Sequence, residues 1–249
     1  MTTEHQSVQN SVQDSIQGYY NKQWSSSGKD MFTLAFRSAL GQSYAFLGDV
    51  REKKLLEIGC GSGEQAVYFA SQGTKVTVID LSSESLKRTQ KLAEEKKVTV
   101  SAMQMNAEQL VFPSDSFDFV YINSTLMHVD KLRVLEECSR ILKKEGKLVI
   151  VEPLQYALFV QMYRLFSSYR RMKPRYATLK MFKEGKKYFS EFQHEEFYFL
   201  ASLFLPMYYF RNTLLHRLYD SAATIDSGLL KIFPWLRKAC WVSVVQYKK

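Results

Sequence analysis

Short apolar runs separated by amphipathic stretches fill the middle of the chain. The runs lie at residues 55–58, 75–80, 98–105, 119–122 and 147–151, and the intervening sequence predicts helices at 64–72, 82–96 and 130–142. Continuous apolar runs are typical of strands that are buried on both faces of a parallel sheet. We therefore expect an α/β fold with a doubly wound sheet, in which a strand and helix repeat five times between Leu55 and Val151.

The pattern changes after Pro153, where aromatic residues become frequent. It predicts a helix at 155–172, a second helix starting at 188–191, a sixth strand at 207–211, a helix at 213–232 broken near 226–228, and an antiparallel edge strand at 241–247. Before the first strand, residues 16–36 predict one or two short helices. We interpret residues 1–249 as one domain, comprising an N-terminal helical lid (1–45), a nucleotide-binding core (46–153), a basic aromatic cap (154–206) and a closing segment (207–249).

A glycine-rich turn follows the first strand directly. Gly59, Gly61 and Gly63 are spaced every second residue, and glycine lets a backbone turn sharply and approach a ligand closely. Such a turn predicts a nucleotide site. The spacing G-x-G-x-G differs from the dinucleotide fingerprint G-x-G-x-x-G, and this argues against a nicotinamide or flavin cofactor.

An acid ends the second strand. Asp80 lies where a ligand crosses the carboxyl ends of adjacent strands, so its carboxylate can accept hydrogen bonds from both hydroxyls of a ribose. The alternative is structural, because an acid at the end of a buried strand needs a partner in any case.

These motifs together resemble the class I S-adenosylmethionine (SAM)-dependent methyltransferases. Glu57 precedes the glycines as in the family's first motif, and residues 106–118 are similar to its D-A-E-x-L-P-F-x-x-x-S-F-D stretch, with Asn106 and Val111 replacing the usual acid and proline. The resemblance implies a Rossmann-like, seven-stranded sheet with an antiparallel last strand, and SAM as cofactor. The cofactor-binding residues that it implies are Tyr20 of the lid, Glu57, Gly59, Cys60, Gly61 and Gly63 near the methionine end, Asp80 and Leu81 at the ribose, Asn106 and Ala107 at the adenine, and Asn123 beneath the methionine.

The resemblance extends to the reaction. His128 matches a histidine of small-molecule methyltransferases of the quinone-biosynthesis type, and could act as a base, cap a helix or line the pocket. Glu152 could orient a polar acceptor or be a solvated strand end. His194 and His216 are further candidates, more simply explained as structural. A D-P-P-Y-like motif is missing near residue 123, which argues against methylation of nucleic-acid bases.

Composition limits the partners. The formal charge is +9, and nine Lys/Arg against one acid lie between Arg164 and Lys187. This segment could contact phosphates, anionic lipid or an acidic substrate, or be a solvated helix face. Three separated cysteines predict reduced thiols in the cytoplasm and no metal site. The apolar run 197–210 is shorter than the roughly 20 residues that span a bilayer, so we expect at most peripheral membrane contact.

The aromatic residues of the cap predict a lid over a hydrophobic acceptor, although core packing explains part of them. Candidates for its lining are Tyr163, Phe166, Tyr198, Tyr208 and Tyr209. Three hypotheses follow. The chain is a methyltransferase acting on a small, hydrophobic or aromatic metabolite, a methyltransferase acting on RNA or another macromolecule through the basic segment, or a non-catalytic module that binds a membrane or a partner. The sequence does not fix the acceptor atom (O, N or C) or the oligomeric state.

Overall fold

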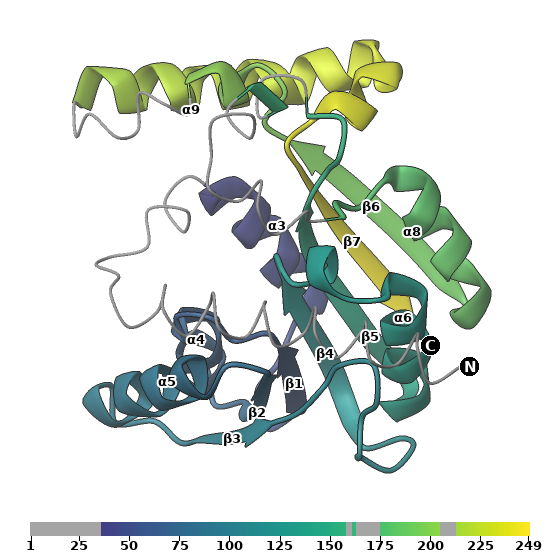
Figure 1. Ribbon diagram of the computed structural model, residues 1–249. Helices are drawn as coiled ribbons and strands as arrows, with labels where there is room; N and C mark the ends of the chain where they lie inside the picture. The colour runs from purple at the N-terminus through teal and green to yellow at the C-terminus, as the bar shows by residue number, and fades with distance from the viewer. Residues whose placement is uncertain (1–35, 158–160, 163–174, 205–212) are drawn as a thin grey trace.

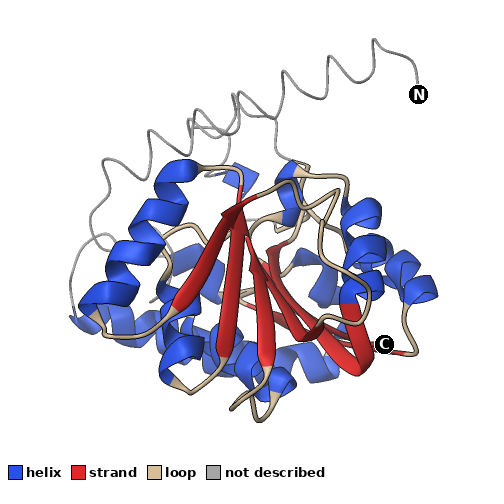
Figure 2. Cartoon of the chain, turned by 90° about the horizontal axis from the view of Figure 1, so that it is seen from below, coloured by secondary structure: helices blue, strands red, loops and turns tan. Residues whose placement is uncertain are grey.

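The computed structural model describes residues 36–157, 161–162, 175–204 and 213–249. Over this part of the chain a seven-stranded sheet is covered by helices on both faces (Figures 1 and 2). The strands lie in the order β3-β2-β1-β4-β5-β7-β6. Their bounds are β1 (Lys54–Ile58), β2 (Lys75–Asp80), β3 (Val100–Gln104), β4 (Phe117–Asn123), β5 (Leu142–Pro153), β6 (Glu191–Phe197) and β7 (Val242–Lys248).

Strands β1 to β5 run parallel to one another, and β7 runs antiparallel to both β5 and β6. The predicted doubly wound sheet with a reversed last strand is therefore confirmed. The prediction that this strand lies at the edge of the sheet is wrong, because β7 pairs with β5 on one side and with β6 on the other, and β6 forms the edge. The order of strands changes direction between β1 and β4. In open α/β sheets a ligand binds at such a switch point, outside the carboxyl ends of the strands.

Each face of the sheet packs against its own set of helices. The bounds are α3 (Arg37–Leu47), α4 (Glu64–Ser71), α5 (Ser83–Glu95), η1 (Leu126–His128), α6 (Lys131–Ile141), α8 (Leu179–Gly185), η3 (Lys186–Tyr188), α9 (Thr213–Ile232) and η5 (Pro234–Ala239). One apolar cluster joins α3, α4 and the first half of the buried side of α9 to the sheet, and the other joins α6, α8 and Leu230 of α9. Helix α6 shows why these segments are helical: Val134, Leu135, Cys138 and Ile141 form its buried stripe, and the Asp130 carboxylate accepts bonds from the first amides.

Three expectations about secondary structure are wrong. The expected alternation of strand and helix is interrupted between β3 and β4, where residues 105–116 form turns and no helix. Residues 188–191 do not start a helix, because η3 ends at Tyr188 and β6 follows. Helix α9 is not broken near residue 226: Asp226 is buried, and its carboxylate accepts bonds from the amides of Leu200 and Ala201, so it anchors the helix.

Several predictions fall outside the described residues. They are the lid before residue 36, most of the helix at 155–172 and the strand at 207–211. Among the described helices, none is long and apolar enough to cross a membrane.

Candidate functional site

The glycine turn lies between β1 and α4, at the edge where β1, β2 and β4 end. Gly59 and Gly63 have φ angles of 78° and 81°, which other residues adopt only with strain. A Cβ on Gly59 would lie 2.1 Å from the Thr125 Oγ1 atom, and one on Gly63 would lie 2.7 Å from the Thr89 Cα atom. Glycine is therefore required, because the turn after β4 and helix α5 pack directly against this backbone.

Glu57, in β1, lies beside the turn with an incompletely satisfied carboxylate. Its side chain is buried and its Oε2 atom has no hydrogen-bond partner among the described residues. Burial raises the pKa of Glu57 well above its ordinary value, and the nearby Asp80 carboxylate adds to the rise, although the Ala66 amide opposes it. A buried oxygen without a partner is costly, and a cationic amino group would satisfy it. This arrangement fits the expected position of the methionine end of SAM.

Asp80 ends β2 next to the same turn. Its Oδ1 atom accepts a bond from the Ser82 amide at 2.8 Å, and its Oδ2 atom accepts one from the Gly61 amide at 3.3 Å. The carboxylate thus has the structural partner that a buried strand end needs, and burial raises its pKa. Two carboxylate oxygens offer about four acceptor positions, so capacity for ribose hydroxyls remains. The buried Cys60 thiol lies 3.8 Å from Oδ2, and the Leu81 carbonyl accepts a bond from Gln104.

The stretch after β3 is also tied to its own backbone. The Asn106 Oδ1 atom, expected to face adenine, accepts a bond from the Glu108 amide at 2.9 Å. Ala107 is buried. The Glu108 carboxylate accepts a bond from the Asp130 amide at 2.9 Å, directly before α6. An amide oxygen accepts two bonds, so Asn106 can still face adenine, while Glu108 has a structural role.

The turn after β4 contains a residue that sequence reasoning missed. Asn123 ends the strand, and its Oδ1 atom accepts a bond from the Ser124 hydroxyl. Thr125 donates from its Oγ1 atom toward the carbonyls of Ile58 and Asn123, at 3.2 and 3.1 Å, and so joins the ends of β1 and β4 above Gly59. Asn123 and His128, on either side of it, were named from the family resemblance. A threonine that packs on a glycine follows no spacing rule.

His128 and Glu152 lie beyond this turn, with two cations nearby. Burial, with a contribution from Lys131, lowers the pKa of His128 to about 4. Burial raises the pKa of Glu152 to about 8, although the amides of Leu126 and Met127 and the Lys131 ammonium oppose the rise. These two amides face the carboxyl group without the geometry of a hydrogen bond, so neither oxygen of Glu152 has a hydrogen-bond partner among the described residues. The Arg175 amide donates to the Met127 carbonyl at 3.0 Å, which brings a second cation to this turn.

The structure does not bring the other candidates to this edge. His194 lies on the outer strand β6 and bonds to the Glu196 carboxylate at 2.7 Å. Tyr198 is buried in the core, and its hydroxyl accepts a bond from the Ala39 amide, so it is not a lining residue of a surface pocket. The remaining candidates lie outside the described residues or have side chains that do: Tyr20, Tyr163, Phe166, Tyr208, Tyr209 and His216.

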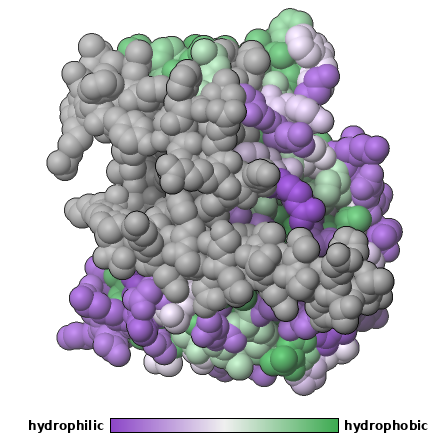
Figure 3. Space-filling model, in the orientation of Figure 1, coloured by the Kyte–Doolittle hydropathy of each residue, from purple (hydrophilic) through white to green (hydrophobic). Residues whose placement is uncertain are grey.

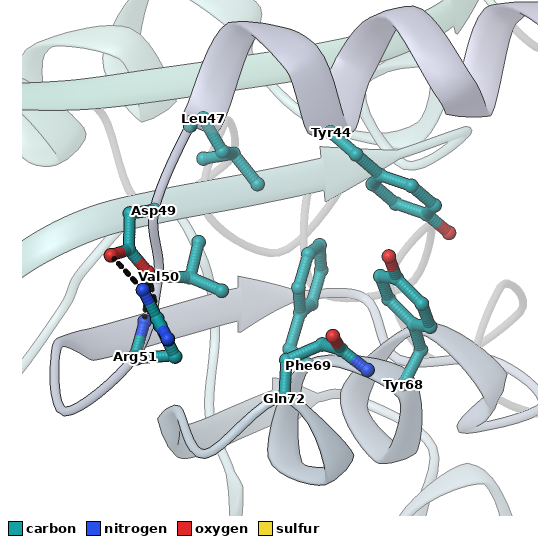
Figure 4. Close-up of a pocket in the computed structure, with 9 residues that line it drawn as sticks. Tyr44, Leu47, Asp49, Val50, Arg51, Tyr68, Phe69 and Gln72 are labelled. Atoms are coloured by element: carbon teal, nitrogen blue, oxygen red, sulfur yellow. Dashed lines mark hydrogen bonds and ion pairs between the residues drawn. The ribbon is translucent and has the colours of Figure 1, made fainter.

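A cavity of about 300 Å³ opens elsewhere, between α3 and α4 (Figure 4). Tyr44 of α3 and Tyr68 of α4 stack on each other in its lining, with ring centroids 4.5 Å apart, and the loop carrying Asp49 and Arg51 closes one side. That loop leads into the amino end of β1. Nucleotides bind at the carboxyl ends of such strands, so this cavity is not the expected cofactor site.

Comparison with known proteins shows similarity to methyltransferases over the central part of the chain. A family model described as a methyltransferase domain matches residues 56–150. A ubiquinone biosynthesis O-methyltransferase from Actinobacillus pleuropneumoniae is 34% identical over 102 residues, which are 39% of this chain and 44% of that protein. The chain spans about half the length of the curated relatives it matches.

Solved structures share the fold over most of the chain. The crystal structure of the YcgJ protein from Bacillus subtilis has a TM-score of 0.62 at 19% identity and covers 86% of this chain and 98% of its own. The phosphoethanolamine N-methyltransferase 2 of Haemonchus contortus, in complex with SAM, has a TM-score of 0.63 at 18% identity and covers 88% of this chain and 56% of its own.

Proposed function

We propose that this protein, whose residues 56–150 match a methyltransferase domain model, transfers a methyl group from SAM to a small hydrophobic or aromatic acceptor. The observation that carries the proposal is the buried Glu57 carboxylate, with one oxygen unpartnered, beside a glycine turn that admits no side chain. A site for a nucleotide with an amino-acid end needs both features.

The cofactor would supply a methyl group activated on a sulfonium, and the chain's residues would hold it. Glu57 would pair with the amino group of the methionine end, next to the glycine turn. Asp80 would accept hydrogen bonds from the ribose hydroxyls while keeping its bonds to the Ser82 and Gly61 amides. Asn106 would accept a bond from adenine through the free lone pair of its oxygen. Tyr20 and Asn123 remain proposed contacts from the lid and from the end of β4.

His128 and Glu152 would position the methyl acceptor, and His128 would accept its proton. His128 is neutral at neutral pH because burial and Lys131 lower its pKa to about 4, so it can accept a hydrogen bond or a proton. Such a low pKa makes it a weak base, which suits an acceptor whose proton is already acidic, such as a phenol. Glu152 keeps its proton at neutral pH, since its pKa is about 8. It would then donate a hydrogen bond to a neutral oxygen of the acceptor.

The class of acceptor rests on two further observations. A curated relative is named for ubiquinone biosynthesis, and the chain beyond Pro153 is rich in aromatic residues. Both support a quinone precursor or another aromatic metabolite, with O, N or C as the methylated atom. Much of the basic segment 164–187 lies outside the described residues, and no described contact favours RNA.

Isothermal titration with SAM, S-adenosylhomocysteine and NAD tests the cofactor. We expect micromolar binding of the two sulfur compounds and none of NAD. Gly59→Ala should abolish binding, because its Cβ would collide with Thr125. Gly228→Ala, where a Cβ meets nothing within 4 Å, is the matched control and should bind normally. A folded wild-type sample that binds neither sulfur compound, even with phenolic and quinone acceptors added, would refute the proposal.

Turnover is tested with the same panel of acceptors, by following S-adenosylhomocysteine release. We expect His128→Ala to lower kcat/KM on the active acceptor by roughly 10²-fold or more if it takes the proton. Cofactor affinity measured by titration should stay unchanged in that variant. An unchanged kcat/KM would exclude His128 as the base while leaving the reaction class intact.

A further inference from the structure

Helix α9 and the following η5 segment expose a row of large apolar side chains. Leu218, Ile225, Ile232, Phe233 and Trp235, which we call the α9 ridge, have exposed fractions of 44%, 59%, 71%, 44% and 66%. Figure 3 shows apolar residues along the edge where Figure 1 draws α9. Single exposed apolar residues are ordinary, but a contiguous group marks a contact surface.

The spacing of the ridge is regular. Leu218, Ile225 and Ile232 are seven residues apart, and each step of seven residues turns the position by only about 20° around a helix. The buried side of α9, with Tyr219, Ala222 and Leu230, faces the core. The apolar arc of the helix is therefore wider than its packing against the protein uses, and the ridge forms the unused flank.

The charge around the ridge is positive. Between Thr213 and Ala239 there are four Lys/Arg and two Asp. Asp226 is buried and bonds to backbone amides, and Asp220 pairs with Arg37 at 2.9 Å. Lys231 and Lys238 are exposed beside the apolar residues. An amphipathic helix with Trp and aliphatic residues beside Lys/Arg is typical of segments that lie in the interface of an anionic bilayer.

The ridge lies at the same edge of the sheet as the proposed active site. The carboxylate of Asp226 bonds to residues 200 and 201, directly after the carboxyl end of β6. Segment η5 leads into β7, whose first residue Val242 pairs with Pro153, next to Glu152 at the carboxyl end of β5. A surface docked through the ridge would therefore adjoin the acceptor side of the molecule.

We propose that the α9 ridge binds the surface of an anionic lipid bilayer, with its apolar side chains in the headgroup region and Lys231 and Lys238 against lipid phosphates. This adds a binding surface to the proposed function, under which a lipophilic acceptor would reach the site from the membrane. Lipid binding itself requires neither cofactor nor turnover, so the two proposals fail independently.

Co-sedimentation with phosphatidylcholine vesicles, with and without phosphatidylglycerol, tests the proposal. We expect wild type to bind the anionic vesicles, with an affinity that falls as salt rises. The triple variant Ile225→Gln, Ile232→Gln, Trp235→Gln should weaken partitioning by roughly tenfold or more. Lys231→Gln with Lys238→Gln should weaken binding to anionic vesicles by roughly fivefold for each lysine. Val111→Gln removes an apolar side chain that is 74% exposed far from α9, and should bind as wild type does.

Two measurements keep the outcome decisive. Circular dichroism and thermal unfolding of each variant show whether its domain is folded, without reference to cofactor binding. Quenching by brominated lipid should be stronger in wild type than in Trp235→Phe, because Trp235 is exposed while Trp241 is buried. The proposal is overturned if wild type ignores anionic vesicles, or if the triple variant binds them equally well. It is also overturned if the triple substitution converts a dimer to a monomer without affecting vesicle binding, since the ridge is then a contact between two copies.

Discussion

Replacing Glu152 with glutamine should make the protein progressively more stable than wild type as pH rises. Burial raises the pKa of Glu152 from 4.5 to about 8 in the folded protein. Between these pH values the folded protein retains a proton that the unfolded chain has released. The free energy of unfolding of wild type therefore falls with rising pH through this group. Glutamine has nearly the same shape and does not titrate.

The magnitude follows from the two pKa values. One group with these pKa values lowers the free energy of unfolding by roughly 3 to 4 kcal/mol between about pH 5 and pH 8. The difference between Glu152→Gln and wild type should change by the same amount over this range, with the variant gaining. At any single pH the stability of Glu152→Gln also includes the cost of burying the polar amide of glutamine. Only the change of the difference with pH therefore reports the titration of Glu152.

Guanidinium unfolding of both proteins at the two pH values gives the four free energies required. Glu195→Gln serves as the control for removal of one carboxylate, since Glu195 is exposed on β6. If the difference between Glu152→Gln and wild type changes by less than about 1 kcal/mol, Glu152 is solvated or paired in solution. The assignment of a protonated carboxyl group at the acceptor site would then be wrong.

Three further predictions concern the cofactor turn and the core. SAM binding should release protons, because burial raises the pKa of Glu57 and a cationic amino group beside it would lower that pKa, so affinity should rise with pH. Titrations in buffers of different ionisation heat measure this release, and release that persists in Glu57→Gln would assign it to another group. Gly63→Ala should lower the free energy of unfolding by about 2 kcal/mol or more, because its φ is 81° and its Cβ would lie 2.7 Å from the Thr89 Cα atom. Gly41→Ala is the control, because a Cβ there has open space. If Gly63→Ala lowered the free energy of unfolding no more than Gly41→Ala does, this packing would be contradicted. Asp130→Ala should cost about 1 kcal/mol in denaturant unfolding, because its carboxylate caps α6, and an unchanged midpoint would show that Glu108 alone positions the helix.

The central strands were predictable because strands buried on both faces have continuous apolar sequences. Leu55, Leu56 and Ile58 of β1 are almost completely buried, and only a strand covered on both faces needs such a run. Asp80 was predictable for a related reason, since an acid at the end of a buried strand needs a partner, whereas Glu57 was named only from the family resemblance. These features depend on local sequence and general sheet geometry.

Strand β6 was not predictable in the same way. Its sequence, Glu-Phe-Gln-His-Glu-Glu-Phe, contains residues that favour helix or tolerate it. It is an edge strand with alternating exposed positions, and pairing with β7 decides its conformation. Similarly, the connection between β3 and β4 needs no helix because Arg140 of α6 donates to the carbonyls of Leu110 and Phe112. Contacts between distant residues decide both cases.

In the candidate site, too, local motifs were predictable and contacts between distant residues were not. Motif spacing predicted the residues near the glycine turn, but not that Asn106 and Asp80 would already bond to neighbouring amides. It also could not predict Thr125 over Gly59 or the position of Arg175 beside the His128 turn, since these contacts join separate elements. Resemblance identified the positions, while the pKa values of His128 and Glu152 depend on burial that only the folded chain creates.

Strand β7 is synthesised after β6 yet lies between β6 and β5. During translation, one edge of β5 therefore stays unpaired until β7, about ninety residues later in the chain, has been made. Before β7 leaves the ribosome, β6 has no partner in the sheet, and the edge of β5 can pair with other chains. We expect nascent chains to need protection by chaperones at this stage, and slow synthesis after β6 to favour aggregation.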